Sequence, residues 1–438
     1  MLFILNFVLL LIGALISQSV SSFTFGLLAL FWGYFMIYKV LRNNYKPLFF
    51  VFNISFFIYL LATILRYVDV SMYPDIFYKG IDEIHFFKES EGASNISISK
   101  LVREFFESRY IENELYYFYI RLISSVSTSL FDGNSIYLQL LGTSLIGSYV
   151  SIFMYSILNH FKIANPVNKT ILFMLFTCLL PVSVIIHRDS MVAFLYSVSL
   201  YIALVAPYSV KNLLFQGCLV LVTFFVREQS GLFIIGILLA SMFIHSSGNK
   251  WFRLLFICIF LIFLSYATFL LDNLNDTMEY YTQLSKDNAS SGLSRYIAQL
   301  PIGLKQFFLI IQGQFQPLPI WANFPENPTF VSVLFAILWG VISVFWFHIF
   351  SFFLFFVVRE YSKMPRNLVI WSLVFLLFLV LNFANADPRR MVCMYPLGYL
   401  VYLYLRQYVV LKKYAIPFNK CYYSTVFLFM MLIAYLKV

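Results

Sequence analysis

The sequence is poor in charged residues, which make up only 11% of its 438 positions. A soluble globular domain carries about 25%. Hydrophobic residues account for 61% of the chain and aromatic residues for 20%, and the mean hydropathy is +0.83. This composition excludes a soluble globular protein, and we expect the chain to lie in a lipid bilayer.

Cysteines are few, and their arrangement suggests neither a disulfide framework nor a zinc site. The five are Cys178, Cys218, Cys258, Cys393 and Cys421. They occur singly within or beside apolar runs, with no Cys-x-x-Cys pair and no histidine at the spacing of a metal ligand. We interpret all five as small apolar residues, and the sequence predicts no metal site.

The N-terminal segment lacks the marks of a cleaved signal peptide. Residues 2–16 are apolar, but no basic segment precedes them and no small-residue cleavage site follows. Ser17 to Ser22 instead suggest a tight turn into a second apolar segment. No internal repeat and no low-complexity tail is recognisable, so the sequence predicts a single transmembrane domain over residues 1–438.

What the chain does contain is a series of long apolar segments. A helix needs about 20 apolar residues to cross the hydrocarbon core of a bilayer. Candidate segments are residues 2–16, 23–40, 48–66, 135–158, 170–186, 190–207, 212–226, 230–246, 253–271, 329–356, 367–386, 391–410 and 421–437. The sequence therefore predicts an all-α, polytopic integral membrane protein with about 13 transmembrane helices.

Lysine and arginine gather in alternate connections between these segments. They are Lys39, Arg42 and Lys46; Lys162 and Lys169; Lys211; Lys250 and Arg253; Arg359, Lys363 and Arg366; and Arg406, Lys412, Lys413 and Lys420. Glu360 is the only acidic residue among them. Because basic loops stay in the cytoplasm, these connections and the N-terminus are predicted to be cytoplasmic. They also explain the net charge of +10 without a nucleic-acid partner.

The opposite connections hold most of the acidic residues and are predicted to face outward. They comprise two long loops, residues 67–134 and 272–328, and short turns at 187–189, 227–229 and 387–390. Within the first loop, aromatic and charged residues alternate between 99 and 119, which is typical of interfacial helices. Residues 115–131 form either a fourteenth span or another interfacial helix, and Arg121 and several serines within them favour the second. Residues 301–315 are apolar but short, which suggests a re-entrant or surface helix.

The first long outer loop contains the adjacent carboxylates Asp82 and Glu83, followed by His85. Neighbouring carboxylates repel one another, and an aromatic setting near the membrane disfavours charge, so one of the pair is suited to act as a general base. The alternative is an ordinary solvated acidic loop, which is what most acidic runs are.

Arginines occur at three of the predicted outer turns. Arg188 and Asp189 stand where one span ends and the next begins, so that Asp189 or Ser190 can cap the new helix while Arg188 offers a fork of donors to a phosphate. Arg227 stands at a second turn, where the alternative is a local ion pair with Glu228. A charged side chain at membrane depth is costly and is therefore a functional hypothesis by default.

Arg389 and Arg390 form the only doubled arginine on the predicted outer side. Outer arginines at the start of a span run against the positive-inside bias, so they need a reason. An anionic ligand is a better reason than a salt bridge to Asp387 alone. Together, the outer turns predict a site for a lipid that bears phosphate.

In the order of these features the chain resembles the GT-C superfamily of membrane glycosyltransferases. Within that superfamily it is most similar to bacterial O-antigen and capsule polymerases of the Wzy type. The resemblance covers about residues 70–410, and its motifs are short. They are Asp82-Glu83-Ile84-His85-Phe86-Phe87, Pro181 through Arg188-Asp189-Ser190, Arg227 through Gly231-Leu232, Phe315-Gln316-Pro317-Leu318-Pro319, and Pro388-Arg389-Arg390 through Tyr395-Pro396.

The resemblance implies inverting sugar transfer from a polyprenyl-phosphate or polyprenyl-diphosphate donor on the outer face of the bacterial inner membrane. Asp82 would activate the acceptor hydroxyl, with Glu83 as its neighbour or substitute. His85 and Asp189 would contact substrate, and the phosphate clamp would consist of Arg227, Arg389, Arg390 and Arg188. Partners would be polyprenyl-linked sugars, membrane lipids, a chain-length regulator and a flippase. No cofactor is implied, although some relatives use a divalent metal for which this sequence offers too few ligands.

Two departures from the family pattern stand out. Three spans precede the Asp-Glu pair, where many members have one, and Arg188 occupies the position before the Asp that is often lysine. Two other functions remain open at this point. A GT-C enzyme that adds a single sugar would share the same features, and so would a flippase for lipid-linked oligosaccharides. A transporter, however, should show internal repeats and charged residues in mid-span.

Overall fold

The computed structural model describes residues 2–40, 45–72, 81–107, 113–245, 300–301, 304–315, 329–381 and 391–437. These residues are 88% helical and contain no strand, which confirms the predicted all-α class. The predicted span 253–271, most of the second outer loop (272–328), and Arg389 and Arg390 lie outside the described residues.

Five of the described helices are long and apolar enough to cross a membrane: Val20–Lys39, Tyr45–Met72, Ile136–His160, Glu228–His245 and Phe330–Lys363. Shorter apolar helices of 10–17 residues cover Leu2–Ser17, Asp189–Leu204, Val210–Val226 and Arg366–Leu379. These helices confirm a helical membrane protein. The total of about 13 spans stays a prediction.

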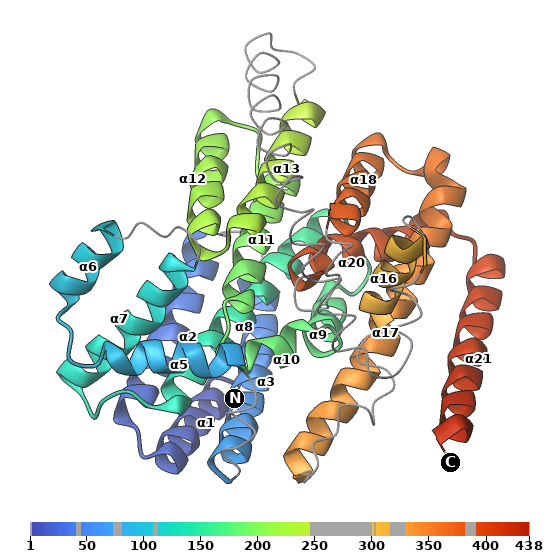
Figure 1. The fold of residues 1–438 in the computed structure, drawn as a ribbon. Helices are drawn as coiled ribbons and strands as arrows, with labels where there is room; N and C mark the ends of the chain where they lie inside the picture. The colour runs from blue at the N-terminus through green and yellow to red at the C-terminus, as the bar shows by residue number, and fades with distance from the viewer. Residues whose placement is uncertain are drawn as a thin grey trace.

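The N-terminal helices form one packed group around α8 (Figure 1). They are α1 (Leu2–Ser17), α2 (Val20–Val40), α3 (Tyr45–Met72) and α8 (Ile136–His160). Their shared core is rich in aromatic side chains such as Phe52, Phe56 and Tyr149. Two buried polar side chains pair within it, since Asn6 Nδ2 donates to Asn53 Oδ1 over 3.0 Å. Pairing of this kind removes the cost of an unsatisfied polar group in an apolar setting.

Helix α8 is the centre of the molecule, because 89% of its most apolar stretch is buried. Small residues recur along it, and they allow neighbouring helices to approach closely. A Cβ atom added at Gly147 would lie 2.3 Å from Ser183 Oγ and 2.8 Å from the Tyr59 ring. The Ser144 hydroxyl also donates to the Tyr59 carbonyl over 3.2 Å. Helix α8 thus brings α3 and the segment around Ser183 together.

The predicted continuous span 170–186 is wrong. The structure has two short helices there, α9 (Pro166–Leu175) and α10 (Leu179–Ser183), separated by a non-helical break. Pro181 contributes to the irregularity because it has no backbone N–H to donate. Every residue of α10 is buried. This segment therefore lies within the protein, and its end at Ile186 and His187 is buried as well.

The remaining helices pack on the far side of α8 from α1. They are α11 (Asp189–Leu204), α12 (Val210–Val226), α13 (Glu228–His245), α16 (Leu304–Phe315), α17 (Phe330–Glu360), the 3-10 turn η3 (Tyr361–Lys363) and α18 (Arg366–Leu381). The predicted span 391–410 is composite, with a 3-10 turn η5 (Val392–Met394), α20 (Tyr395–Tyr404) and a π-helical turn η6 (Leu405–Val409). The last helix is α21 (Lys412–Lys437). In this core Trp346 stacks on Tyr395, with ring centroids 3.6 Å apart.

The first predicted outer loop is largely helical. Helix α3 continues to Met72, and α5 (Ile81–Gly92), α6 (Ile98–Glu107) and α7 (Glu114–Leu130) follow. Asp82 and Glu83 therefore do not lie in a loop, as predicted, but in the first turn of α5. Carboxylates are favoured there by the helix dipole. Helix α5 lies crosswise to α3 and α8 (Figure 1), and its last turn is held by Asn134, whose Nδ2 donates to Ser90 Oγ over 2.9 Å.

The two ends of α8 have different surroundings. Beyond its C-terminal end, the Tyr408 and Gln407 side chains from η6 donate to the Lys162 carbonyl, the tyrosine over 2.6 Å. Basic residues are frequent there, including Lys162, Lys169 and Arg406. The opposite end lies beside α5 and α7. All of the described candidate site residues gather at that opposite end.

Candidate functional site

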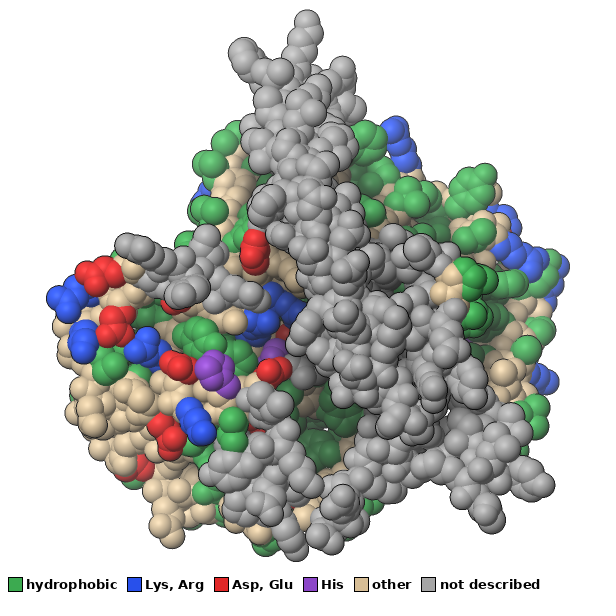
Figure 2. Space-filling view, in the orientation of Figure 1, with side chains coloured by type: hydrophobic (Ala, Val, Ile, Leu, Met, Phe, Trp, Pro, Cys, Tyr) green, Lys and Arg blue, Asp and Glu red, His purple; other side chains and the backbone are tan. Residues whose placement is uncertain are grey.

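Charged side chains from four separate parts of the chain meet around the start of α5. They come from the end of α3, the first turn of α5, the turn before α11, and the turn between α12 and α13. Figure 2 shows acidic, basic and histidine side chains gathered on this face, whereas most of the remaining coloured surface is hydrophobic. Charges are rare in this sequence, so their meeting here defines the candidate site.

Glu83 is buried, with 6% of its surface exposed. Its carboxylate accepts from Arg66 Nη2 over 3.1 Å and from the Ile186 backbone N–H over 3.3 Å. Both donors satisfy the hydrogen-bonding capacity of a carboxylate that is shielded from water. It joins α5 to α3 and to the end of the α10 segment. These contacts give Glu83 a structural role and leave it poorly placed to meet a substrate.

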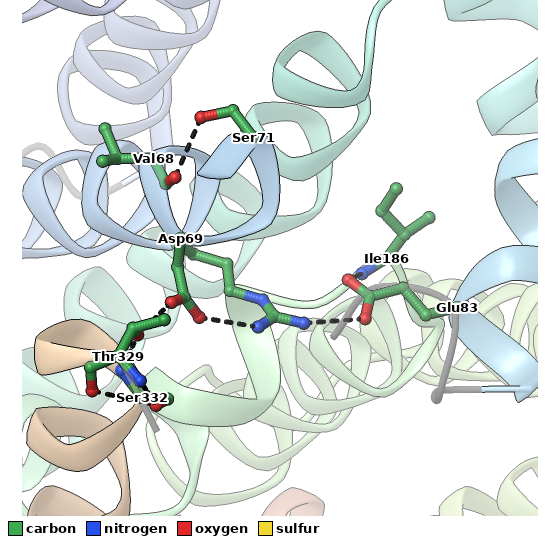
Figure 3. Close-up of polar contacts among 8 residues, drawn as sticks. Val68, Asp69, Ser71, Glu83, Ile186, Thr329 and Ser332 are labelled. Carbon is green, nitrogen blue, oxygen red and sulfur yellow. Dashed lines mark hydrogen bonds and ion pairs between the residues drawn. The ribbon is translucent and has the colours of Figure 1, made fainter. Parts of the chain in front are cut away.

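Arg66 is the residue that links Glu83 to the rest of the network. Asp69 and Glu83 face each other from α3 and α5 (Figure 3), and Arg66 lies between them, with its Nη1 3.5 Å from Asp69 Oδ2. Asp69 also accepts from the hydroxyl of Thr329, the N-cap residue of α17. Arg66, Asp69 and Thr329 thus tie together three helices, α3, α5 and α17.

Asp82 is the exposed member of the acidic pair, with 63% of its side chain accessible. Its Oδ2 atom lies 3.7 Å from Nε2 of His187, whose side chain is only 7% exposed. The two adjacent carboxylates therefore have opposite environments: Glu83 faces inward and Asp82 faces outward. Of the two, only Asp82 is placed to take a proton from a molecule arriving from solvent.

His187 and Arg227 both contact Asp189, which is 2% exposed. His187 Nδ1 lies 2.8 Å from Asp189 Oδ2, and Arg227 Nη1 donates to Asp189 Oδ1 over 3.1 Å. The prediction that Asp189 caps α11 is wrong, because it is the first helical residue and its carboxylate turns to these side chains instead. The alternative of a local pair between Arg227 and Glu228 does not describe this contact either.

Aromatic rings form one wall of the site. Phe86 packs edge-on against both Tyr116 and His187, with centroid distances of 4.9 and 5.5 Å. His85 lies on the outer side of α5, where its Nε2 is 3.0 Å from the Tyr117 hydroxyl. These rings exclude water from the inner part of the site, which strengthens the electrostatic interactions there.

The pKa of the Tyr116 hydroxyl depends on the charged groups around it. Burial raises the pKa of its hydroxyl, the nearby carboxylates of Asp189 and Glu83 raise this pKa further, and Arg188 lowers it. Arg188 is therefore close enough to act on the same group, and its side chain is half-buried. Arg389 and Arg390 are not described. The structure thus brings Asp82, Glu83, Asp189 and Arg227 into one network with Arg188 nearby, while the two late arginines remain untested.

An apolar groove of about 670 Å³ is lined by residues of α2, α7, α8, α11 and α12. Met191 of α11 and Tyr119 of α7 line it and also pack against the cluster that contains Phe86 and Ile186. The groove is bounded further by α8, α12 and α2, where Leu28 and Trp32 are exposed. An apolar lining of this kind suits the hydrocarbon chain of a lipid.

Three members of the network were missed by the sequence analysis. Arg66 and Asp69 lie at the end of a segment predicted to span the membrane, and His187 is adjacent to the arginine that drew attention. The rarity of charges at span ends was the one signal that could have found them. Among the described residues, no group of three or more His, Cys, Asp or Glu side chains is arranged to hold a metal ion.

Comparisons with protein-family models, with curated proteins and with solved structures found no match to this chain.

Proposed function

We propose that the chain is a membrane glycosyltransferase that polymerises surface polysaccharide from repeat units carried on a polyprenyl phosphate or diphosphate. One observation carries the proposal: Asp82, the exposed carboxylate, stands at the edge of a buried charged network, and Met191, two residues after Asp189 of that network, lines an apolar groove. The proposed substrate has three parts that need different surroundings. The sugar needs a carboxylate as base, the phosphate needs charged groups, and the hydrocarbon chain needs an apolar surface. The resemblance to GT-C polymerases supports the same substrate class.

In this proposal Asp82 takes the proton of the acceptor hydroxyl as its oxygen attacks the anomeric carbon. Arg188, Arg389 and Arg390 contact the phosphate and stabilise the charge that develops on the leaving group. His85 contacts the sugar from the outer side of α5. Arg227 and Asp189 support the site without contacting the substrate, because their mutual ion pair is buried. The groove accepts the first part of the polyprenyl chain.

The proposal includes a GT-C fold with about 13 spans, in the inner membrane of a bacterium with the site on the outer face. Several described features support this arrangement. The candidate site lies at one end of α8, and the loop that contains Lys162 lies at the other. Basic residues favour the cytoplasmic side.

The proposal is tested by deleting the gene and examining the polysaccharide by gel electrophoresis. Loss of polymerisation collapses the ladder to a single repeat unit. Loss of the complete unit would instead indicate a single-sugar transferase, and accumulation of lipid-linked units on the cytoplasmic side would indicate a flippase. Either of these two patterns would overturn the polymerase assignment.

The site is tested by restoring the gene with single substitutions. Asp82→Asn should leave one repeat unit, because the amide cannot accept the proton, whereas Glu91→Gln on the exposed end of α5 should restore the full ladder. Protein levels in the membrane are compared by immunoblot. A normal ladder with Asp82→Asn would remove this residue from catalysis.

Arg389 and Arg390 are tested by replacement with Ala and with Lys. The alanine variants should weaken use of the lipid-linked donor more than they lower protein level. Lysine should restore only part of the activity, because an ammonium group does not reproduce the bidentate fork of a guanidinium. Full activity in both alanine variants would contradict a phosphate-binding role.

A further inference from the structure

His187 occupies a position that the proposed reaction has not used. It lies between two carboxylates, with Nδ1 2.8 Å from Asp189 Oδ2 and Nε2 3.7 Å from Asp82 Oδ2. Its ring is held by Phe86 and is nearly buried, whereas Asp82 is exposed. The imidazole is therefore the buried partner, and Asp82 is the partner that is open to solvent.

The neighbours of His187 determine which nitrogen holds the proton in the neutral ring. Arg227 donates to Asp189 Oδ1, and the other oxygen of that carboxylate faces His187. A carboxylate acceptor at 2.8 Å favours a proton on Nδ1 and leaves the Nε2 lone pair directed toward Asp82. The Asp189 backbone N–H also lies 3.4 Å from Nδ1. The carboxylate contact is shorter and charge-assisted, so it decides the tautomer.

The other carboxylate in the first turn of α5 does not compete for this role. Glu83 faces Arg66 and the Ile186 N–H, on the inner side of the same helix. Among the described residues, the charged and titratable groups around His187 are Asp82 and Glu83 from α5, Tyr116 and Tyr117 from α7, Arg188 and Asp189 at the start of α11, and Arg227. Glu83 and Asp189 each contact an arginine, whereas Asp82 approaches His187 Nε2 from the exposed side of the site.

We propose that His187 is a positioning residue that aligns Asp82 and receives the proton which Asp82 takes from the acceptor. This inference rests on the proposed function. As the acceptor O–H bond breaks and the oxygen attacks the sugar, the departing phosphate retains the electron pair of the sugar–oxygen bond. The proton moves first to Asp82 and then to His187 Nε2. The imidazolium that forms lies between two carboxylates, and Asp82 is restored as a carboxylate for the next step.

The kinetic test uses membranes that contain the variant protein, supplied with the lipid extract of the deletion strain as substrate. His187→Gln should lower kcat by about 100-fold, the lower end of the usual contribution of acid–base groups, and should leave KM unchanged. The wild-type rate should fall in acid, because an imidazole that already holds a proton cannot accept one from Asp82. In His187→Gln this fall should move to lower pH. His160→Gln, at the far end of α8, is the matched histidine control and should behave as wild type.

The outcomes separate this inference from the proposed function. If the gene deletion leaves the ladder intact, the proposed function fails, and if Asp82→Asn retains full activity, the catalytic role of Asp82 fails together with this inference. If Asp82→Asn is inactive while His187→Gln keeps the wild-type kcat and pH profile, only the role of His187 fails. A rise in KM or a fall in protein level, without a change in the pH profile, would show a merely structural role and would also overturn the inference.

A second measurement does not depend on whether His187→Gln folds. The protein is labelled with ¹³C-histidine, and the titration of the five histidines is followed by NMR in the wild type and in Asp82→Asn. Asp82 is exposed, so its substitution should not disturb folding. The midpoint of His187 should fall in Asp82→Asn, because the imidazolium loses a neighbouring carboxylate. An unchanged midpoint would show that the two side chains do not share a proton.

Discussion

At the scale of single residues, the two adjacent carboxylates of α5 have different roles. One stabilises the fold, and the other is open to a substrate. Glu83 is directed into the protein and is bound by Arg66, whereas Asp82 remains open to solvent. The sequence predicted the pair as a unit and could not decide between its members. Register decides, because neighbouring residues on a helix differ in direction by about 100°.

Arg66 is expected to stabilise the fold more than its single charge suggests. Arg66→Met would leave Asp69 and Glu83 without their shared partner, and Asp69 is 2% and Glu83 6% exposed. Breaking a buried ion pair by removing one side costs about 3–5 kcal/mol. We expect a clearly lower unfolding temperature in detergent.

The matched control for Arg66→Met is Arg103→Met. Arg103 pairs with Glu107 over 3.8 Å, but both side chains are about two-thirds exposed (67% and 69%). Exposed pairs contribute about 0–1 kcal/mol. Equal unfolding temperatures for the two variants would show that the network around Arg66 is energetically unimportant.

At the scale of elements, the close approach of α8, α10 and α3 depends on residues without bulk. Gly147→Val should destabilise the protein, because the added carbons would overlap Ser183 and Tyr59. Overpacking of a core costs about 1–3 kcal/mol. Gly217→Ala in α12 is the control, since a Cβ there meets nothing within 4 Å. Thermal unfolding of the two variants should differ, and similar values would contradict the tight packing.

Helix α2 depends on a carboxylate from a distant segment. Asp132 accepts from the backbone N–H groups of Val20 over 2.7 Å and Ser21 over 3.0 Å, which are among the first donors of the helix. Partial burial raises the pKa of Asp132, but hydrogen bonds from Ser21 and Val20 lower it, and the result is a pKa below its ordinary value of 3.8.

The sign of the pH effect follows from this lowered pKa. The stabilisation by Asp132 is fully present above pH 3.8 and is lost as the pH falls through the lower folded-state pKa. Asp132→Ala should therefore lower stability at neutral pH by about 1 kcal/mol, the usual contribution of a helix cap. The difference from wild type should shrink in acid, measured by unfolding at several pH values. A difference that grows in acid would contradict the capping role.

At the scale of the whole molecule, sidedness is the property to test. Glu91→Cys at the end of α5 should react with a membrane-impermeant maleimide in intact cells, in a background without the five native cysteines. Ala164→Cys, in the exposed loop after α8, should react only after the cells are opened. Labelling of both from the same side would contradict the proposed topology.

The sequence predicted much of the helical layout because apolar length alone determines it. The segments 2–16, 48–66 and 135–158 correspond to α1, α3 and α8. Their bounds agree within a few residues, except that α3 continues to Met72. The break in 170–186 was missed because a buried broken helix is as apolar as a continuous one. Asp82 and Arg227 were singled out by the rarity of their charge. Arg66 and His187 were not, because their significance arises from partners far away in the chain.

The bond between Thr329 and Asp69 has a mechanical consequence. Thr329 closes the first turn of α17 through its capping box with Ser332, and Asp69 reaches Glu83 through Arg66. Thr329, Asp69, Arg66 and Glu83 therefore form an unbroken series of contacts from the start of α17 to the helical turn that bears Asp82. The position of that turn is thus coupled to a residue more than two hundred positions downstream in the sequence.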